Sequence, residues 1–244
     1  MKTGNLIIAF WLAAISTLLA QNNVAQFAKA NQEFAAGNLK AATADYEELV
    51  RAGGDSPNLF YNLGNAYFRQ KDFGRAILNY ERARALNPRH AEAQANLRVA
   101  RDEARALELS PRHWERWLGL ATANQYAIGA TIAFWIGALA LASFIFNRRR
   151  AALALSIFAM SIFALAAIAV YEFERGKSGA GLAVVTSANV DARLATADTA
   201  NRVLTLPAGS EIQILSRRGD WIYAALPNNL RGWMPAKSAE QVRM

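Results

Sequence analysis

The sequence predicts a multi-domain fold: an all-α solenoid, a two-helix transmembrane hairpin and a small all-β barrel, in that order. Helical residue patterns recur in the first half of the chain at a spacing of about 34 residues. Two long uncharged segments occupy the middle, and short alternating strands separated by turn residues fill the C-terminal part. These patterns are typical of helical repeats, membrane helices and antiparallel sheets. We place the boundaries at 1–20 (signal peptide or anchor), 21–110 (repeats with a capping helix), 118–147 and 151–171 (transmembrane helices) and 180–244 (barrel).

Composition and charge exclude several classes of site. The chain has 244 residues, a formal net charge of +8 and no cysteine. Without cysteine, the chain has neither a disulfide framework nor a thiolate metal site. Between Gln21 and Arg116, basic residues alternate with nearly as many acidic ones. Such alternation is typical of solvated helix surfaces, so we expect no nucleic-acid partner.

The N-terminus resembles a secretory signal. Lys2 precedes the apolar run Leu6–Ala20, and a charged start before an apolar core is typical of such signals. Cleavage after Ala20 fits, although Leu18 stands where a small residue is usual. The alternative is an uncleaved membrane anchor. Both interpretations predict export of the chain beyond Ala20.

Two segments are long and apolar enough to cross a bilayer. No residue carries a charge from Trp117 to Asn147 or from Ala151 to Tyr171, and a helix needs about 20 apolar residues to span the hydrocarbon core. On the first span, Gly129, Ala133 and Gly137 recur on one face. Small residues at this spacing allow close helix packing, either between the two spans or with a partner.

The short link between the spans predicts the topology. It contains three consecutive arginines, Arg148 to Arg150, and the positive-inside rule places such a loop in the cytoplasm. An exported N-terminus leads to the same topology, with both soluble modules periplasmic and the chain multi-pass in the inner (cytoplasmic) membrane. Trp114 and Trp117 are expected to anchor the first span at the interface.

The segment from Pro57 to about Arg89 has the spacing of a known helical repeat, carried by Phe60, Leu63, Gly64, Tyr67, Ala76, Tyr80, Ala83 and Pro88. Gly64 and Ala76 are small where two helices cross, and Pro88 stops the second helix. Glycine costs a helix interior about 1 kcal/mol relative to alanine, and we expect packing at the crossing to offset that cost. The segment resembles a tetratricopeptide repeat, which implies paired antiparallel helices stacked in an array.

A weaker copy precedes this repeat, in which Gly64, Phe68, Phe73, Ala76 and Tyr80 are replaced by Ala30, Phe34, Leu39, Ala42 and Tyr46. The Ala- and Arg-rich segment that follows, from about His90 to Leu109, lacks the glycine and has no obvious partner helix. We expect it to be the capping helix that such arrays need.

The first helices of the repeats are expected to line a concave surface. By helical phase, the peptide-binding candidates are Asn31, Phe34, Asn58, Tyr61, Asn62, Asn65, Phe68 and Arg69, with Phe27 beside them. One subset of such repeats grips a terminal carboxylate with Lys and Asn, but Phe27, Glu92 and Asn96 stand where cations are needed. The sequence therefore favours an aromatic and amide groove for an internal peptide. The alternative is that some of these aromatic residues only pack between repeats.

After a polar hinge at Glu172–Gly179, the pattern changes to short strands with period two, which predicts a small closed barrel. The elements LPAGSEI and GDWIYAAL with RGWMP resemble bacterial SH3-like domains. This resemblance implies that Trp221 and Trp233 are a possible ligand site for a peptide or glycan. The alternative is that they fill the ends of the barrel. Asp191 and Arg193 are expected to form a local pair or to contact a ligand.

Catalysis is not expected. The sequence contains no P-loop, no dinucleotide-binding glycine motif and no zinc-binding spacing. Its two histidines, His90 and His113, have no nucleophile with a supporting acid nearby in the sequence. We therefore predict a non-enzymatic protein without a cofactor or metal.

The order of signal, repeats, two spans and SH3-like segment resembles the BatE class of Bat-type aerotolerance proteins. That resemblance implies a membrane-linked assembly with von Willebrand factor A-type proteins and a MoxR-type ATPase, connected with stress or oxygen tolerance. The predicted function is a membrane-anchored scaffold for protein or peptide partners. The alternative is an envelope sensor that binds peptidoglycan through its barrel.

Overall fold

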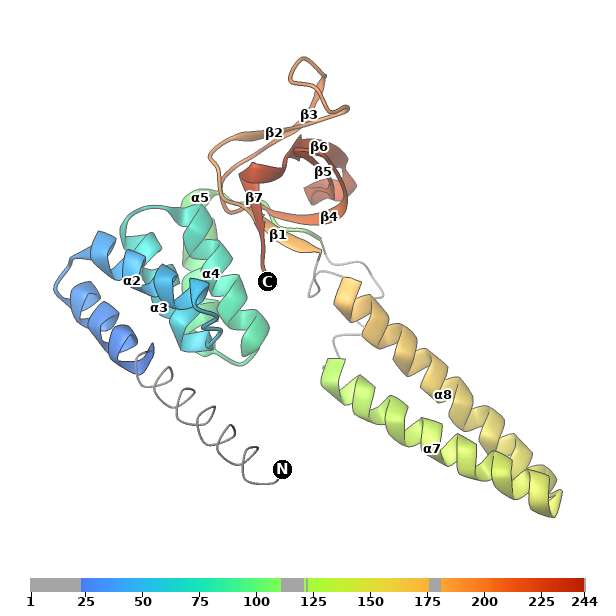
Figure 1. Ribbon diagram of the computed structural model, residues 1–244. Helices are drawn as coiled ribbons and strands as arrows, with labels where there is room; N and C mark the ends of the chain where they lie inside the picture. The colour runs from blue at the N-terminus through green and yellow to red at the C-terminus, as the bar shows by residue number, and fades with distance from the viewer. Residues whose placement is uncertain (1–22, 111–120, 122, 176–180, 244) are drawn as a thin grey trace, which may run out of the picture.

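A computed structural model describes residues 23–110, 121, 123–175 and 181–243 and has three parts (Figure 1). A layer of short helices packs against a curved β-sheet, and a long two-helix hairpin extends away from both. The expected signal segment, Trp114, Trp117 and His113 lie outside the described residues.

The helical layer consists of antiparallel pairs. Its elements are a helix at residues 23–35, α2 (Leu39–Arg51), α3 (Pro57–Arg69), α4 (Phe73–Leu86) and α5 (Ala91–Ala104). Side-chain caps explain where three of them begin: Ser56, Asp72 and His90 accept backbone N–H bonds at the starts of α3, α4 and α5. Such caps satisfy backbone donors that the first turn leaves without partners.

The helices of each pair cross where the side chains are smallest. A Cβ atom added to Gly64 would lie 2.7 Å from two ring carbons of Tyr80 and 3.3 Å from the carbonyl oxygen of Ala76. Tyr46 and Tyr80, which occupy equivalent places in the two pairs, are both fully buried. The helical repeats predicted from the sequence are therefore present.

The helix α5 is shorter than predicted. It ends at Ala104, and Arg105 adopts a left-handed conformation with φ of 50°, which terminates a helix. Residues 106–109, here called the strap, run beside the C-terminal sheet. The Glu211 N–H donates to the Leu107 carbonyl oxygen at 2.9 Å. The prediction of a helix to Leu109 was wrong because the strap is extended and its backbone bonds to Glu211, which lies far away in the sequence.

The hairpin consists of α7 (Ala123–Asn147) and α8 (Arg150–Arg175), which pack along their length. A Cβ atom at Gly137 would lie 3.0 Å from Met160, and the Ser156 hydroxyl donates to the Gly137 carbonyl oxygen at 3.0 Å. Gly129 has open space around it, so it is not part of this close packing. Because α8 continues to Arg175, the predicted hinge at Glu172–Gly179 begins too early.

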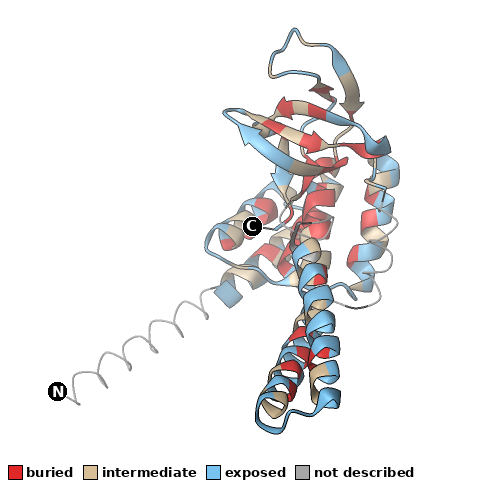
Figure 2. Cartoon of the chain, turned by 90° about the vertical axis from the view of Figure 1, so that its right-hand side faces the viewer, coloured by how far each residue is buried: buried red, intermediate tan, exposed pale blue. Residues whose placement is uncertain are grey.

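Both hairpin helices are long and apolar enough to cross a membrane. Their surfaces are largely exposed along the whole hairpin (Figure 2), including large apolar side chains such as Trp135, Phe146 and Phe158. Exposed apolar area of this extent in water is unfavourable, and a lipid environment removes that cost.

The C-terminal part is a seven-stranded antiparallel sheet in the order β3-β2-β6-β5-β4-β1-β7. Its strands are β1 (Leu182–Val185), β2 (Val190–Arg193), β3 (Arg202–Leu206), β4 (Glu211–Arg218), β5 (Trp221–Ala225), β6 (Arg231–Pro235) and β7 (Ala239–Gln241). The sheet curls around its own core (Figure 1), and an irregularity between Ile214 and Ser216 in β4 contributes to the bend. No ladder joins the edge strands β3 and β7 among the described residues, so the predicted closed barrel is not confirmed.

The sheet packs directly against α4 and α5. Leu182 and Val184 of β1, together with Val242, share one hydrophobic core with Ile77 and Leu97 of the helices. Removal of apolar surface from water favours this contact. The repeats and the sheet thus form one body, here called the soluble unit.

A buried ionic cluster crosses the same interface. Arg101 of α5 is paired with Glu81 of α4 and with Glu211 of β4, and both carboxylates are almost completely buried. Arg84 also contacts Glu81 at 2.6 Å. Buried charges are tolerated only when they are paired and hydrogen-bonded, so this cluster requires the helices and the sheet to be together.

We predict that Gly64→Ala destabilises the soluble unit. The new methyl group meets the Tyr80 ring at 2.7 Å, and overpacking of this kind costs about 1–3 kcal/mol, more than the gain in helix propensity. Thermal unfolding of the full chain, followed by near-UV circular dichroism, should show a lower midpoint. Gly129→Ala, a helical glycine with open space, should leave it unchanged. An unchanged midpoint for Gly64→Ala contradicts the assigned crossing.

Candidate functional site

The candidate site is a hollow on the concave side of the helical layer. A cavity of about 520 Å³ is lined by Phe27, Asn58, Tyr61, Asn62, Asn87, Arg89, His90 and Glu92. Four of these, Phe27, Asn58, Tyr61 and Asn62, were predicted from helical phase. We call this cavity the groove.

The other four lining residues belong to the turn before α5 and its first helical residues, and they were not among the peptide-binding candidates, although the sequence placed Glu92 at a clamp position. A signal for one of them was present, because Glu92 occupies in α5 the place that Asn58 has in α3. The cap of α5 explains its geometry: His90 accepts the Ala93 N–H at 3.3 Å, and its ring lies 4.9 Å from that of Tyr61. The turn therefore forms one wall of the groove.

Asparagine side chains hold neighbouring first helices together. The Asn31 side-chain oxygen accepts the Tyr46 hydroxyl at 2.6 Å and the Asn62 side-chain N–H at 2.9 Å. Tyr46 comes from the second helix of the same pair and Asn62 from the first helix of the next. One side-chain oxygen thus joins three helices.

The same arrangement recurs one repeat later. The Asn65 side-chain oxygen accepts the Tyr80 hydroxyl and the Asn96 side-chain N–H, both at 2.8 Å. This internal copy extends the repeat geometry into α5, which was predicted to be only a cap. The side-chain oxygens of Asn31 and Asn65 thus already accept hydrogen bonds from other side chains of the protein.

The remaining predicted residues, Phe34, Phe68 and Arg69, do not line the groove. The Arg69 guanidinium lies 5.1 Å from the centroid of the Phe34 ring and donates to the Phe34 carbonyl oxygen at 3.4 Å. The Phe68 ring contacts Phe73 with centroids 5.5 Å apart. Such contacts each contribute about 0.5–1.5 kcal/mol. These aromatic residues pack within and between repeats, as the alternative interpretation proposed.

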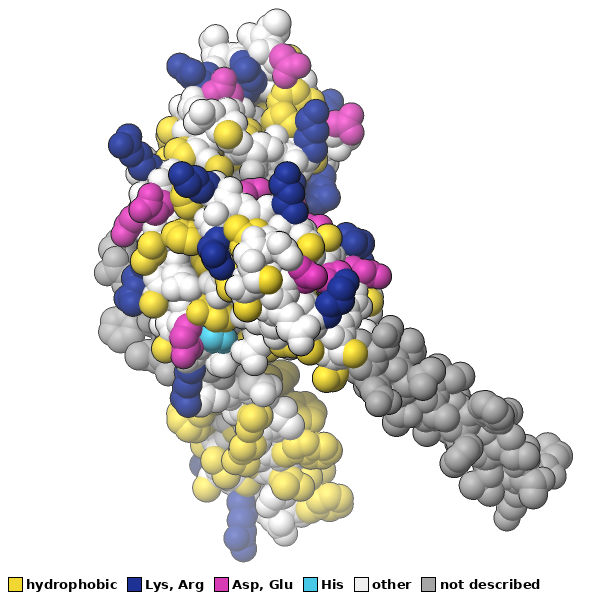
Figure 3. All heavy atoms as spheres, turned by 90° about the vertical axis from the view of Figure 1, so that its left-hand side faces the viewer, with side chains coloured by type: hydrophobic (Ala, Val, Ile, Leu, Met, Phe, Trp, Pro, Cys, Tyr) yellow, Lys and Arg dark blue, Asp and Glu magenta, His cyan; other side chains and the backbone are white. Residues whose placement is uncertain are grey.

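The charge around the groove is mixed. His90 Nδ1 lies 3.0 Å from a Glu92 carboxylate oxygen, and Arg89 is on the same wall. Figure 3 shows basic and acidic side chains interspersed over the face that carries α2. A strongly charged ligand gains little from such a surface, so the groove suits a largely neutral segment.

Burial raises the pKa values of two tyrosines that lie beneath the groove, Tyr46 and Tyr80. It raises the pKa of Tyr46 from 10.0 to about 12 and raises that of Tyr80 as well. Desolvation of the phenolate is the main cause, because both side chains are fully buried. Both hydroxyls are therefore protonated donors in the asparagine network at neutral pH.

The sheet presents a second surface. Ile222 and Met234 point into the sheet core, whereas Tyr223 and Trp233 pair across the opposite face with ring centroids 5.0 Å apart. The interpretation of Trp233 as a barrel plug was wrong because its strand alternation places it outside the core. Trp221, two residues before Tyr223, lies on the same outer face.

Asp191 and Arg193 form the local pair that the sequence suggested, at 3.4 Å. Asp191 also accepts the Thr205 hydroxyl at 2.7 Å, and Arg193 donates to the Ala200 carbonyl oxygen at 2.9 Å. These bonds tie β2 to β3. Among the described residues, no group of three or more His, Asp or Glu could hold a metal ion.

A family model for the tetratricopeptide repeat matches residues 57–90. The chain contains a tetratricopeptide repeat. The match covers α3, α4 and the turn that leads to His90, and the pair before it has the same helix crossing and the same asparagine contacts. Among curated proteins, no relative matches the chain. Tetratricopeptide repeats generally mediate contacts with protein partners, which supports an interaction scaffold.

We predict that stability falls at alkaline pH through the buried tyrosines. Tyr46 ionises near pH 10.0 in the unfolded chain but only near pH 12 in the folded one. Its contribution to stability is therefore complete below pH 10 and is lost as the pH rises through 12. Urea unfolding midpoints measured from about pH 8 to pH 11 should decrease, and Tyr46→Phe should flatten the decrease. An identical slope in the variant contradicts this origin.

Proposed function

We propose that the protein is a membrane-anchored, non-enzymatic adaptor whose groove binds an extended segment of a partner protein. The observation that carries the proposal is the groove itself, an open concave cavity of about 520 Å³ lined by the exposed amide of Asn58 and the half-buried rings of Phe27 and Tyr61. A peptide backbone offers N–H and C=O groups to amides such as Asn58, and its side chains can pack on Tyr61. The opposite side of the helical layer is partly covered by the sheet.

The hairpin supports the membrane anchor. With two spans and a link of two arginines, Arg148 and Arg149, both of its outer ends lie on one side of a bilayer. The soluble unit contains chain from before and after the hairpin, which fits this topology. We propose that the soluble unit is periplasmic in an inner membrane.

The proposed partners follow from the resemblance to Bat-type proteins. Von Willebrand factor A-type membrane proteins and a MoxR-type ATPase system belong to that hypothesis, in which the chain displays the groove to another member of the assembly. The SH3-like character of the curved sheet is part of the same proposal. No catalytic role is proposed for any residue.

A second candidate function rests on the outer face of the sheet. Tyr223 and Trp233 pack together there, and Trp221 lies on the same face. Flat aromatic surfaces of this kind suit the apolar faces of sugars. This observation favours the peptidoglycan-binding sensor, in which the sheet is the ligand-binding element.

Site-specific photocrosslinking tests the groove. With p-benzoylphenylalanine in place of Asn58, we expect crosslinks in cells to a defined segment of a partner protein. The same probe in place of Lys40, an exposed residue of α2, should give none. Tyr61→Ser should lower the yield at Asn58 at least about tenfold, which corresponds to 1.4 kcal/mol. Crosslinks to glycan strands from a probe at Trp221, with none from Asn58, would favour the sensor instead.

Cysteine labelling tests the topology, and the absence of native cysteine makes each variant a single-site probe. In spheroplasts, a membrane-impermeant maleimide should label Lys40→Cys and Asp198→Cys, both exposed on the soluble unit. Arg149→Cys in the hairpin turn should react only after lysis. Labelling of Arg149→Cys in intact spheroplasts, with protection of the other two, refutes the proposed orientation.

A further inference from the structure

A second cavity lies on the opposite face of the helical layer from the groove. Its volume is about 240 Å³, and it is formed where α2, α3 and α4 meet β7. On α3, Leu63 and Tyr67 line this cavity, whereas Asn58, Tyr61 and Asn62 line the groove. Helical phase places these two sets on opposite faces of α3. We call this cavity the junction pocket.

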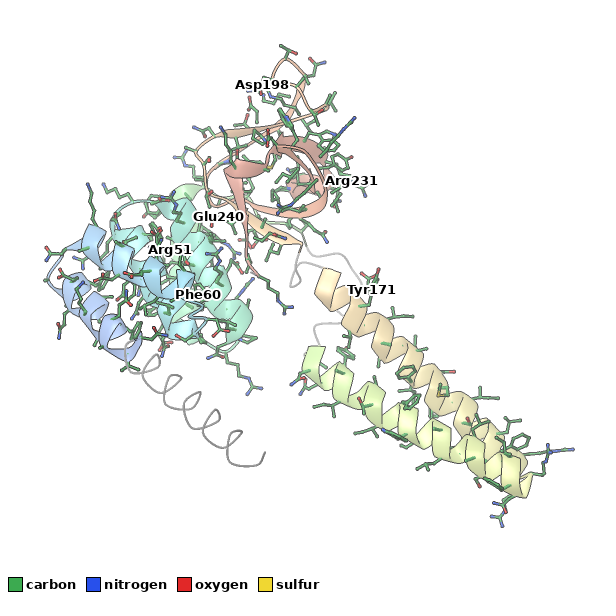
Figure 4. The ribbon with its side chains drawn as sticks, viewed as in Figure 1. Arg51, Phe60, Tyr171, Asp198, Arg231 and Glu240 are labelled. Carbon is green, nitrogen blue, oxygen red and sulfur yellow. The ribbon has the colours of Figure 1, made fainter. Side chains whose placement is uncertain are left out.

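The junction pocket combines an apolar base with a charged rim. Leu63 and Leu78 are buried, and Val50 is half-buried beside them. Arg51 of α2 and Glu240 of β7, both labelled in Figure 4, belong to the lining, and their side chains are 68% and 48% exposed. The pocket therefore opens to solvent past charges of both signs.

One wall of the pocket carries a buried hydrogen-bond acceptor. Asn79 is 2% exposed, and its side-chain N–H donates to the Arg75 carbonyl oxygen at 2.9 Å. That bond orients the amide group, and the Asn79 side-chain oxygen has no hydrogen-bond partner among the described residues. A buried acceptor without a partner costs about 1–3 kcal/mol.

A buried donor lies one helical turn away. The Arg82 side chain is 11% exposed, and one of its terminal nitrogens donates to the Gln241 carbonyl oxygen at 3.1 Å and lies 3.5 Å from Glu240. Its Nε atom has no hydrogen-bond partner among the described residues. Burial lowers the pKa of this guanidinium, which reflects its poor solvation.

We propose that the junction pocket binds an amide group with an apolar substituent, supplied by a peptide segment of a partner protein. Both atoms are buried, so binding requires small rotations of the two side chains toward the pocket. A peptide N–H then donates to the Asn79 side-chain oxygen, and a neighbouring peptide C=O accepts from Arg82 Nε. The apolar substituent fills the space above Leu63 and Leu78. This site is distinct from the groove, and the inference does not rest on the function proposed for the groove.

Size and chemistry both favour this class of ligand. The volume of about 240 Å³ exceeds the roughly 30 Å³ that one water molecule occupies in the liquid, so the pocket has room for a ligand much larger than a water molecule. A carboxylate could accept from Arg82 but has no N–H or O–H to donate to Asn79. A neutral amide supplies both a donor and an acceptor, and a peptide extends past the mixed charges of Arg51 and Glu240.

Direct binding of N-acetyl-leucinamide to the full chain in detergent tests the proposal, with saturation-transfer NMR as the readout. We expect millimolar affinity, typical of a fragment of this size, and weaker binding of N-acetyl-glycinamide, which lacks the apolar side chain. Asn79→Leu should weaken N-acetyl-leucinamide binding at least tenfold. Its thermal midpoint without ligand should change little, because the lost bond from the Asn79 side chain to the Arg75 carbonyl oxygen is offset by removal of a buried acceptor that has no partner among the described residues.

Two further variants serve as controls. Val50→Phe fills the pocket from α2 without touching Asn79 and should also abolish binding, whereas Asn58→Leu in the groove should leave it unchanged. Absence of N-acetyl-leucinamide binding, or equal binding to wild type, Asn79→Leu and Val50→Phe, overturns the site. Tighter binding of N-acetyl-Ala-Leu-Ala-amide than of N-acetyl-leucinamide supports a peptide source, and weaker binding overturns it.

Discussion

The arrangement of the soluble unit depends on the pairing of Arg101 with two buried carboxylates. Arg101 comes from the last turns of α5, Glu81 from α4 and Glu211 from the start of β4. Separation of the sheet from the helices would leave Arg101 paired with Glu81 in the helical layer but would take Glu211 of β4 away from Arg101. The apolar contact between β1 and α4 surrounds this cluster, so ion pairing and hydrophobic burial favour the same docked arrangement.

That docking also determines where the hairpin leaves the soluble unit. On one side of the hairpin, the Leu109 N–H donates to the Glu211 carboxylate at 3.1 Å. On the other side, the Gly181 carbonyl oxygen accepts the Ile214 N–H at 2.8 Å. Both chain segments that flank the hairpin are therefore tied to the single strand β4. Through these two bonds, β4 holds the described chain on both sides of the hairpin to the soluble unit.

The residues of the groove illustrate the limit of prediction from helical phase. Phase identified the face of α3 on which Asn58, Tyr61 and Asn62 line one cavity. It did not distinguish residues that line this cavity from residues that join helices. The oxygens of Asn31 and Asn65 accept bonds from tyrosines of the second helices, and their partners depend on how the helix pairs stack. The wall from Asn87 to Glu92 was missed because a turn has no periodicity from which its direction can be read.

The sequence by itself determined the elements: the helix pairs with Gly64 at a crossing, two apolar helices joined by arginines, and a series of short strands. These follow from local rules, namely residue size, hydrophobic period and turn chemistry, which act within a few neighbouring residues. Only the tertiary structure decided that the sheet stays open, that the strap pairs with β4 and that Arg101 lies between Glu81 and Glu211. Those contacts join residues up to 110 positions apart, and no local pattern specifies which distant partner satisfies a buried charge or an extended backbone.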